Sequence, residues 1–208
     1  SQLRSDNPGV YTVPAAGGAV TLVTRSGSFP HFGADNDRIY LTRGDGPSGT
    51  LVSVDRNGET ERTHAKGEMV AGYEVSPDGV HVAFRDNFGA YIMPLAPGPQ
   101  ETGPGKGAPS MPLVKASAGG ATYMTWTEGG KRLNWTLGPT LYSSTIDAMM
   151  PLTPKKPEQG YKAPTTGTDL SIAVQAAKPT GVTVLTGARI VTMADDAGGV
   201  IDNGVIVI

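Results

Sequence analysis

The chain contains few residues that could do chemistry, and their spacing assembles no catalytic or metal-binding motif. Its three histidines, His31, His64 and His81, lie 33 and 17 residues apart, so no His-x-His pair exists. The chain has no cysteine, which excludes disulfides and thiolate metal sites. His81 alternates with Val80 and Val82, the pattern of an exposed strand position. His31 and His64 lie beside expected loops. We therefore assign no catalytic residue and no metal ligand, and the substrate-binding residues stay unknown.

Other short patterns have both a functional and a plain interpretation, and we favour the plain one. Asp35-Asn36-Asp37 and Asp55-Arg56-Asn57 resemble calcium loops, but neither continues to the bidentate glutamate that such a loop needs. Turns are expected there. Ser48 does not fit Gly-x-Ser-x-Gly and has no paired histidine. Asn134-Trp135-Thr136 matches a glycosylation sequon, yet it lies in a predicted strand.

Four aromatic residues cluster toward the middle of the chain and have two interpretations. They are Tyr123, Trp126, Trp135 and Tyr142. They could line a ligand groove, but we favour core packing, because large aromatic side chains bury the most area.

The composition limits the class of protein. A length of 208 residues allows one large domain or one and a part. A hydrophobic content of 38% with 29 glycines and 17 prolines favours short strands joined by tight turns, an all-β chain. The net charge of −2, from 17 basic and 19 acidic residues, gives no basis for binding nucleic acid. No run of about 18 apolar residues exists to span a membrane.

The sequence repeats one unit along the chain, a turn followed by a strand. Its clearest copy is Ser76-Pro77-Asp78-Gly79 followed by the alternating residues 80–84. Further copies start at residues 34 and 127. A second strand unit recurs at residues 9–13, 49–54, 89–93 and 139–143. Both series advance by about 40 residues and lengthen by about 10 at the same place, which a single insertion within the proline-rich residues 94–112 explains.

A period of about 40 residues that contains four strands is the signature of a propeller blade. Residues 1–148 are therefore predicted to form four-stranded antiparallel blades in an incomplete ring. Ile39, Val82 and Leu133 are expected at equivalent blade positions. The predicted blade segments are a hairpin at 7–24, a blade at 29–64 with an outer turn at 55–58, a blade at 70–114 interrupted by a loop at 94–112, and a blade beginning at 119–148.

The remaining residues divide into a linker and further strands. Residues 149–168 are proline-rich, include the pair Lys155-Lys156, and predict an extended linker. Residues 169–208 predict strands: an alternating run at 169–178, two runs at 182–185 and 188–193, and a final apolar strand at 205–208 after a turn at 195–199.

Two of these patterns resemble known families. The turn-strand repeats, above all Ser76-Pro77-Asp78-Gly79, resemble the WD40-like blades of TolB-type β-propellers, over roughly residues 7–148. The run Leu185-Thr186-Gly187-Ala188-Arg189-Ile190-Val191-Thr192-Met193, with Asn203 to Ile208, resembles the opening of a metal-dependent amidohydrolase, over residues 180–208. In that superfamily this opening forms strands of a small β-sandwich beside a catalytic barrel, whose metal ligands begin with a His-x-His pair that these residues lack.

The resemblance implies a fold class, a function and a location. The fold expected is all-β, a partial propeller followed by β-sandwich strands. The chain would be the non-catalytic part of a metal-dependent amidohydrolase that cleaves C–N or related bonds. The barrel would lie beyond residue 208, in the same protein or another chain. The chain itself would bind no cofactor. A divalent metal, zinc, and a small-molecule substrate belong to the parent protein, expected in the periplasm or secreted.

The alternative is a stand-alone TolB-like propeller that serves protein–protein interaction. A His-x-His motif encoded shortly after residue 208 would favour the hydrolase, and a stop codon there would favour the alternative. Because residues 1–148 supply fewer blades than a closed ring needs, we expect the 208 residues to be an incomplete folding unit.

Overall fold

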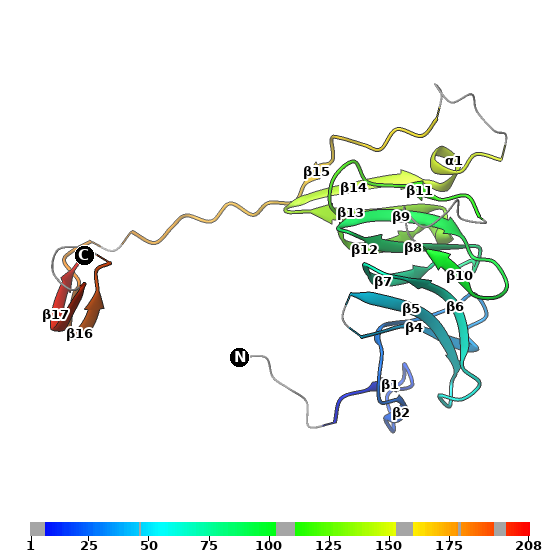
Figure 1. The fold of residues 1–208 in the computed structure, drawn as a ribbon, viewed down its shortest axis with the longest axis horizontal. Coiled ribbons are helices and arrows are strands. Elements are labelled where there is room, and N and C mark those ends of the chain that lie inside the picture. Colours follow the sequence, from blue (N-terminus) through cyan, green and yellow to red (C-terminus); the bar gives the residue numbers. More distant parts are fainter. Residues whose placement is uncertain (1–6, 46, 103–110, 153–159, 179, 194–198) are drawn as a thin grey trace. The chain divides into compact units, whose positions relative to one another are not determined.

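The computed structural model shows an all-β chain, with 51% of its residues in strands and almost no helix. It divides into two compact units, Ser1–Ser171 and Ile172–Ile208. The structure describes residues 7–45, 47–102, 111–152, 160–178, 180–193 and 199–208. The first unit contains four small sheets, numbered 1 to 4 in chain order, and the second contains one hairpin (Figure 1). No helix among the described residues is long and apolar enough to cross a membrane.

Sheet 1 is the hairpin predicted at residues 7–24. It consists of β1 (Val10–Thr12) and antiparallel β2 (Thr21–Thr24). In the connection Gly17 donates its N–H to Pro14 O at 2.8 Å and has a φ of 83°. Glycine adopts this left-handed backbone without steric cost. The hairpin prediction is confirmed.

Sheet 2 contains four antiparallel strands in the order β3-β4-β5-β6, with β10 added beside β6. The predicted turn at residues 55–58 joins β5 to β6. There Gly58 donates its N–H to Asp55 O at 3.0 Å, and Asp55 Oδ1 accepts from the N–H groups of Asn57 and Glu59. The strands are β3 (Ser28–Phe32), β4 (Arg38–Asp45), β5 (Ser48–Asp55), β6 (Arg62–Gly67) and β10 (Gln100–Thr102).

Strand β10 corrects the expectation that residues 94–112 contain no strand. It pairs in parallel with β6, and Thr102 Oγ1 lies 2.9 Å from Tyr73 Oη and donates to Lys66 O at 3.1 Å. The sequence Gln-Glu-Thr has no apolar alternation, so this short strand depends on tertiary contacts rather than on its local pattern. Residues 103–110 of the expected loop lie outside the described residues.

Sheet 3 contains the clearest copy of the repeat, in the order β11-β9-β8-β7. The turn between β7 and β8 forms as predicted. Gly79, with a φ of 72°, donates its N–H to Ser76 O at 2.8 Å, and Asp78 Oδ1 accepts from the N–H of Val80. The strands are β7 (Val70–Val75), β8 (His81–Asp86), β9 (Gly89–Pro94) and β11 (Val114–Lys115).

Sheet 4 has the order β12-β13-β14-β15 and includes residues from beyond the predicted blade. A 3-10 turn, η1 (Glu128–Gly130), joins β12 to β13, and a single helical turn, α1 (Ile146–Met149), follows β14. The strands are β12 (Thr122–Thr127), β13 (Arg132–Leu137), β14 (Thr140–Thr145) and β15 (Thr168–Asp169).

The segment after α1 only partly follows the prediction. Residues 160–167 form no strand or helix but run along the first unit, where Tyr161 Oη donates to Ala116 O at 2.8 Å. The pair Lys155-Lys156 lies outside the described residues. The alternating run predicted as a strand at 169–178 is wrong beyond residue 169. Leu170 still donates its N–H to Pro139 O at 2.8 Å, but Leu170 and Ile172 are exposed and belong to no strand of the described sheets.

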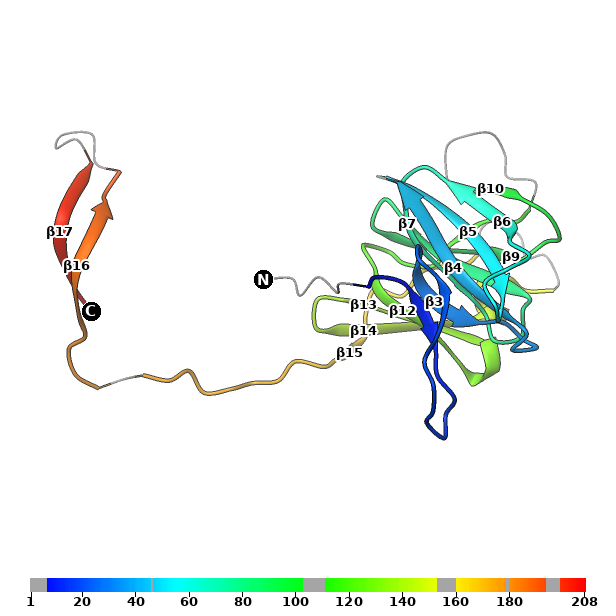
Figure 2. The same cartoon turned by 90° about the horizontal axis from the view of Figure 1, so that it is seen from below.

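The four sheets stack in chain order, and a separate apolar core fills each of the three interfaces (Figure 1). The strands of sheet 2 run obliquely to those of sheet 4 (Figure 2). Between sheets 1 and 2 lie Val10, Val23, Ile39, Leu41, Val52 and Val54. Between sheets 2 and 3 lie Leu51, Ala65, Val70, Tyr73, Val75, Val82, Phe84 and Met93. Between sheets 3 and 4 lie Ala83, Ala90, Ile92, Ala116, Ala121, Leu133, Trp135 and Met149.

Ile39, Val82 and Leu133 occupy equivalent positions, as the repeat predicts. Each is the second residue of the second strand of its sheet, in β4, β8 and β13, and each is buried. Each belongs to the core shared with the preceding sheet. The all-β class and the repeat positions are therefore confirmed. The described sheets do not close into a ring.

The second unit is a hairpin of β16 (Val184–Val191) and β17 (Val200–Val207). It corrects the prediction of two separate runs at 182–185 and 188–193, which form one bulged strand. Gly187 has a φ of 72° at the bulge, and such a glycine bends a strand without ending it. Most of the turn predicted at 195–199 lies outside the described residues. The exposed apolar side chains of this hairpin include Val184, Leu185, Val191, Val200, Ile201, Val205, Ile206 and Val207.

Candidate functional site

The first strands of sheets 2, 3 and 4 are neighbours in space. Strand β7 contacts both β3 and β12, and each of the three is the terminal strand of its sheet. Two side chains fasten them together. His31 of β3 accepts the N–H of Val75 on Nε2 at 2.9 Å, and Trp126 of β12 donates Nε1–H to Glu74 O at 3.0 Å. Three sheets therefore converge on one braced edge.

Each of these three strands contains a bulge near its start. The register shifts fall between Ser28 and His31 in β3, Val70 and Gly72 in β7, and Thr122 and Thr125 in β12. Within the bulges Phe29 has a φ of 53° and Tyr123 a φ of 48°. Left-handed backbone is uncommon for aromatic residues and clusters at functional sites. Both rings face solvent, with Phe29 48% and Tyr123 87% exposed.

A groove of about 590 Å³ lies over this edge, a volume within the range of small-molecule sites. Residues of β3, β7, β8 and β12, with no contribution from the second unit, form its walls. The lining residues are Phe29, Ala71, Gly72, Glu74, Arg85, Thr122, Tyr123, Met124 and Thr125. We call this the inner groove.

Glu74 is the acidic residue of the inner groove. Burial raises the pKa of its carboxyl group to about 7, because desolvation disfavours the charged form. The Nδ1 atom of His31 lies 3.9 Å from Glu74 Oε2. That distance is too long for a hydrogen bond. Glu74 therefore presents a carboxyl group whose protonation changes near neutral pH and which has no hydrogen-bond donor in the described structure.

His31 is a structural residue in this site. Its Nε2 accepts from Val75 N–H, so its proton is on Nδ1, which donates to Phe29 O at 2.8 Å. Burial lowers the pKa of His31, and the neutral tautomer satisfies both bonds. The imidazole thus links β3 to β7 and fixes the carbonyl of the left-handed Phe29. It carries no charge that would neutralise Glu74.

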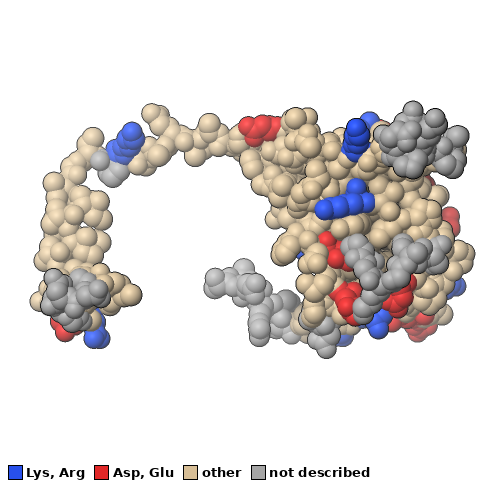
Figure 3. All heavy atoms as spheres, turned by 45° about the horizontal axis from the view of Figure 1, so that its top comes forward, with Lys and Arg blue, Asp and Glu red and all other residues tan. Residues whose placement is uncertain are grey.

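Arg85 of β8 is the basic residue of the inner groove. Its side chain is partly exposed and makes no hydrogen bond or ion pair within the described part of the chain. On the face of the first unit that Figure 3 shows, basic and acidic side chains are mixed, with no continuous basic surface among the described residues. A guanidinium without an ion pair and a carboxyl group that accepts no hydrogen bond in the described structure therefore line the same groove.

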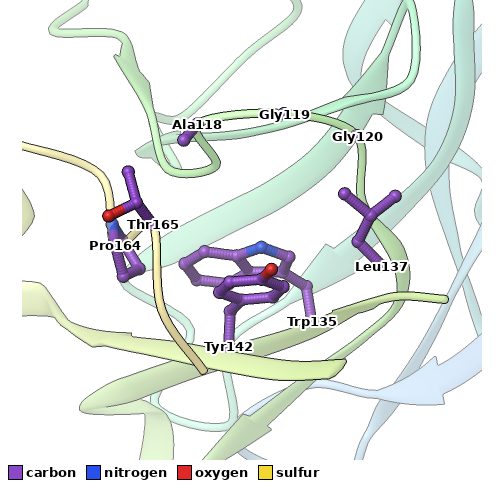
Figure 4. A pocket seen from close by; sticks show the side chains of 8 residues that line it. All are labelled: Ala118, Gly119, Gly120, Trp135, Leu137, Tyr142, Pro164 and Thr165. Atoms are coloured by element: carbon purple, nitrogen blue, oxygen red, sulfur yellow. The ribbon is translucent and has the colours of Figure 1, made fainter. Parts of the chain in front are cut away.

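A second pocket, of about 350 Å³, lies between sheet 4, the loop at residues 118–120 and residues 164–165 of the predicted linker (Figure 4). Trp135 and Tyr142 stack at its base, with ring centroids 6.1 Å apart and planes 13° from parallel. Pro164 and Thr165 close one side. Trp135 is only 1% exposed and belongs to the core. No charged side chain lines this pocket. It therefore offers no acid, base or ion-pairing group to a ligand, and the inner groove is the stronger candidate site.

The structure divides the aromatic cluster that the sequence predicts to be core. Trp135 is buried between sheets 3 and 4, and Trp126 and Tyr142 pack against the same core. Tyr123 does not follow the prediction, because its bulge directs it to the surface, where it lines the inner groove.

His64 forms part of a buried polar network rather than lying beside a loop. It is in β6, and its Nε2 lies 2.7 Å from Ser53 Oγ. Arg38 donates Nε–H to the same hydroxyl at 2.8 Å, so the Ser53 hydroxyl proton points to His64. A serine next to a histidine could suggest a nucleophile. Ser53 is completely buried, however, and no substrate could reach it.

His81 is half-buried rather than exposed as its alternation predicts. Burial lowers its pKa, and its Nδ1 is buried without a hydrogen-bond partner in the described structure. Ser48 begins β5, and no histidine contact to it is recorded among the described residues. Asn134 lies in β13 and donates to Thr127 Oγ1 at 2.9 Å. None of these residues lines the inner groove.

Residues 55–58 form a turn, as predicted, rather than a calcium-binding loop. Asp55 Oδ2 accepts from the hydroxyl of Thr60 at 2.8 Å while Oδ1 serves the turn backbone, so the carboxylate is committed to local bonds. These bonds to the charged form lower the pKa of Asp55. Among the described residues no group of three or more His, Cys, Asp or Glu side chains could hold a metal ion.

No known protein-family model matches the chain, and no curated protein sequence is significantly similar to it. The inner groove therefore has to be interpreted from its own residues. Sequence reasoning missed Phe29, Glu74 and Arg85. The signal in the sequence that could have indicated the groove is Glu74. It interrupts the apolar strand Val70–Val75 directly before the turn at residues 76–79.

Proposed function

We propose that the first unit is a segment of a TolB-like β-propeller and that residues 180–208 contain the opening strands of a metal-dependent amidohydrolase. The chain would then be the non-catalytic part of an enzyme that hydrolyses C–N or related bonds. The barrel and its metal, zinc by the resemblance, belong to the rest of that protein or to a partner chain. A small-molecule substrate and a periplasmic or secreted location belong to the same proposal.

One observation carries the propeller part of the proposal. Ile39, Val82 and Leu133 recur at the same strand position, and each packs on the sheet that precedes its own. Radial repetition of blades requires this, because every blade must present the same face to its neighbour. The convergence of the first strands β3, β7 and β12 on one edge also supports it, since the innermost strands of adjacent blades lie side by side.

The hairpin β16–β17 supports the amidohydrolase part. Two-stranded hairpins are marginally stable alone, and this one exposes apolar residues such as Val184, Ile201 and Val205. Exposed apolar surface of this kind is normally covered by another structural element. Further strands of a β-sandwich would supply that cover. The chemistry itself, attack by metal-bound hydroxide, would require ligands other than those described here.

A second candidate function, a stand-alone interaction module, is favoured by the inner groove. A braced groove with exposed aromatic rings can bind a ligand without any catalytic domain. The two candidates differ in what they require beyond residue 208.

The test is to determine the coding sequence downstream of the Ile208 codon and to assay the encoded protein. The hydrolase proposal predicts a His-x-His motif followed by further histidines and an aspartate. It also predicts turnover of amides or related substrates that a chelator abolishes and zinc restores. Residues 1–208 alone serve as the control and should show no zinc-stimulated turnover. A stop codon directly after Ile208 would refute the hydrolase proposal and leave the interaction module.

A further inference from the structure

We propose that the inner groove binds a small zwitterion, a free amino acid or a short peptide. Its ammonium group would contact Glu74, its carboxylate would contact Arg85, and its apolar part would lie between Phe29 and Tyr123. The inference goes beyond the proposed function and does not depend on it, because it rests only on residues of the first unit. The described groove would bind such a ligand whether or not a hydrolase domain exists.

The charges of the inner groove select for a zwitterion. Glu74 and Arg85 are its only charged lining residues in the described structure, and they are not paired with each other. A simple cation would be attracted by the Glu74 carboxylate but repelled by Arg85. A simple anion would be attracted by Arg85 but repelled by the Glu74 carboxylate. A ligand with one charge of each sign satisfies both groups, and such complementarity sets specificity.

The geometry of the groove is preorganised for this ligand. The Nδ1–H bond of His31 fixes the carbonyl of Phe29. Gly72 leaves room for the phenyl ring, because a Cβ there would lie 2.9 Å from Phe29 Cε2. On the other side the Trp126 bond to Glu74 O anchors β12, which carries Tyr123. The two exposed rings offer apolar faces and can also attract an ammonium group.

Burial of Glu74 gives the proposed site a defined pH response. With a carboxyl pKa of about 7, the free protein holds this group partly protonated at neutral pH. A bound ammonium favours the carboxylate, so binding should release a proton. Below pH 7 affinity should fall as Glu74 becomes protonated. His31 is the other titratable group facing Glu74, and it remains neutral because burial lowers its pKa and its Nε2 accepts the N–H of Val75.

The experiment is isothermal titration calorimetry with the dipeptide Ala-Phe, its N-acetyl derivative and its amide. We expect the free dipeptide to bind and each blocked derivative to bind at least about tenfold more weakly, a loss of about 1.4 kcal/mol. Affinity for the dipeptide should be higher at pH 7.5 than at pH 6, and the binding enthalpy should change with the ionisation enthalpy of the buffer because a proton is released.

Matched variants assign the two charges. Glu74→Gln should abolish the discrimination against the N-acetyl derivative, and Arg85→Gln should abolish that against the amide. The controls are Glu59→Gln and Arg62→Gln, which change exposed residues outside the groove and should leave affinity unchanged. A melting curve of each variant verifies folding.

Three results would overturn the proposal. The first is no heat of binding from any of the three ligands to a folded sample. The second is equal affinity for blocked and free dipeptides. The third is binding of a long peptide that does not depend on its termini, which would indicate a protein-interaction groove instead. None of these results bears on whether a His-x-His motif follows residue 208, so the failure of either proposal can be recognised separately.

Discussion

The indole of Trp126 donates its Nε1–H to the main-chain carbonyl of Glu74 at 3.0 Å, across the interface between sheets 4 and 3. The residue that supplies the groove's carboxyl group is thus also the point where its sheet is joined to the next. Because Tyr123 lies three residues before Trp126 in the same strand, the bond also holds one aromatic wall of the inner groove in register with Glu74.

Replacing Trp126 with phenylalanine should destabilise the first unit. The substitution keeps a ring against the core but leaves the carbonyl of Glu74 without its donor. An unsatisfied, partly buried carbonyl costs on the order of 1–3 kcal/mol. Denaturant unfolding would measure this. Tyr123→Phe is the control, because no side-chain hydrogen bond of Tyr123 is recorded in the described structure and its side chain is exposed. Equal stability of the two variants would contradict the structural role of the indole.

The carboxyl group of Glu74 should make stability fall as pH rises. Its folded-state pKa is raised from 4.5 to about 7, so between these values the folded state binds more protons than the unfolded state. The stabilising contribution is complete below pH 4.5 and is lost as the pH rises through 7. Glu74→Gln should therefore gain stability over the wild type, on the order of 1–3 kcal/mol at pH 8 after allowing for partial solvent screening.

The measurement is the difference in unfolding free energy between Glu74→Gln and the wild type at pH 4, 6 and 8. Taking this difference removes the contribution of His31, whose lowered pKa acts with the opposite sign. Glu59→Gln, which alters an exposed turn residue, should show a difference that does not change with pH. A pH-independent difference for Glu74→Gln would mean that its carboxyl group is not desolvated.

The repeat positions could be predicted from the sequence because their causes are local. A turn that contains Pro77 and Gly79 fixes where β8 begins, and the alternation that follows decides which side chains face each neighbouring sheet. The same reasoning located Ile39 and Leu133. The parallel strand β10 and the pairing of β15 could not be predicted, since both are held by contacts between residues far apart in the sequence.

The position of the inner groove could not be predicted from the sequence either, because it depends on strand bulges. Tyr123 and Trp135 are both aromatic residues in predicted strands, yet one is exposed and the other buried. The difference comes from the bulge in β12, which inserts an extra residue before Thr125 and turns Tyr123 outward. The sequence Thr-Tyr-Met-Thr-Trp-Thr carries no glycine or proline that would indicate such a bulge.

Leu133 should be among the most important residues for stability, because it is completely buried between sheets 3 and 4. Leu133→Ala should cost about 2–5 kcal/mol through lost burial and the cavity that remains. Leu137, in the same strand, is 45% exposed, and Leu137→Ala should cost less than half as much. Urea unfolding of both variants would test the assignment. A similar loss in both would indicate that sheet 4 does not pack on sheet 3 in solution.

Gly58 should be required for docking sheet 1 onto sheet 2. It has a φ of 82°, and a Cβ at this position would overlap the carbonyl oxygen of Val23 in β2, only 1.8 Å away. Gly58→Ala must therefore either move the hairpin β1–β2 or strain the turn at residues 55–58. Gly17 is the matched control, because it has a φ of 83° with no heavy atom near its Cβ position. Gly17→Ala should cost only the left-handed strain, about 1 kcal/mol, whereas Gly58→Ala should cost more. It should also selectively increase amide hydrogen exchange at Val10 and Val23, the two hairpin residues in the core with sheet 2. Equal losses of stability in the two variants, with unchanged exchange in the hairpin, would show that sheet 1 is not packed against this turn.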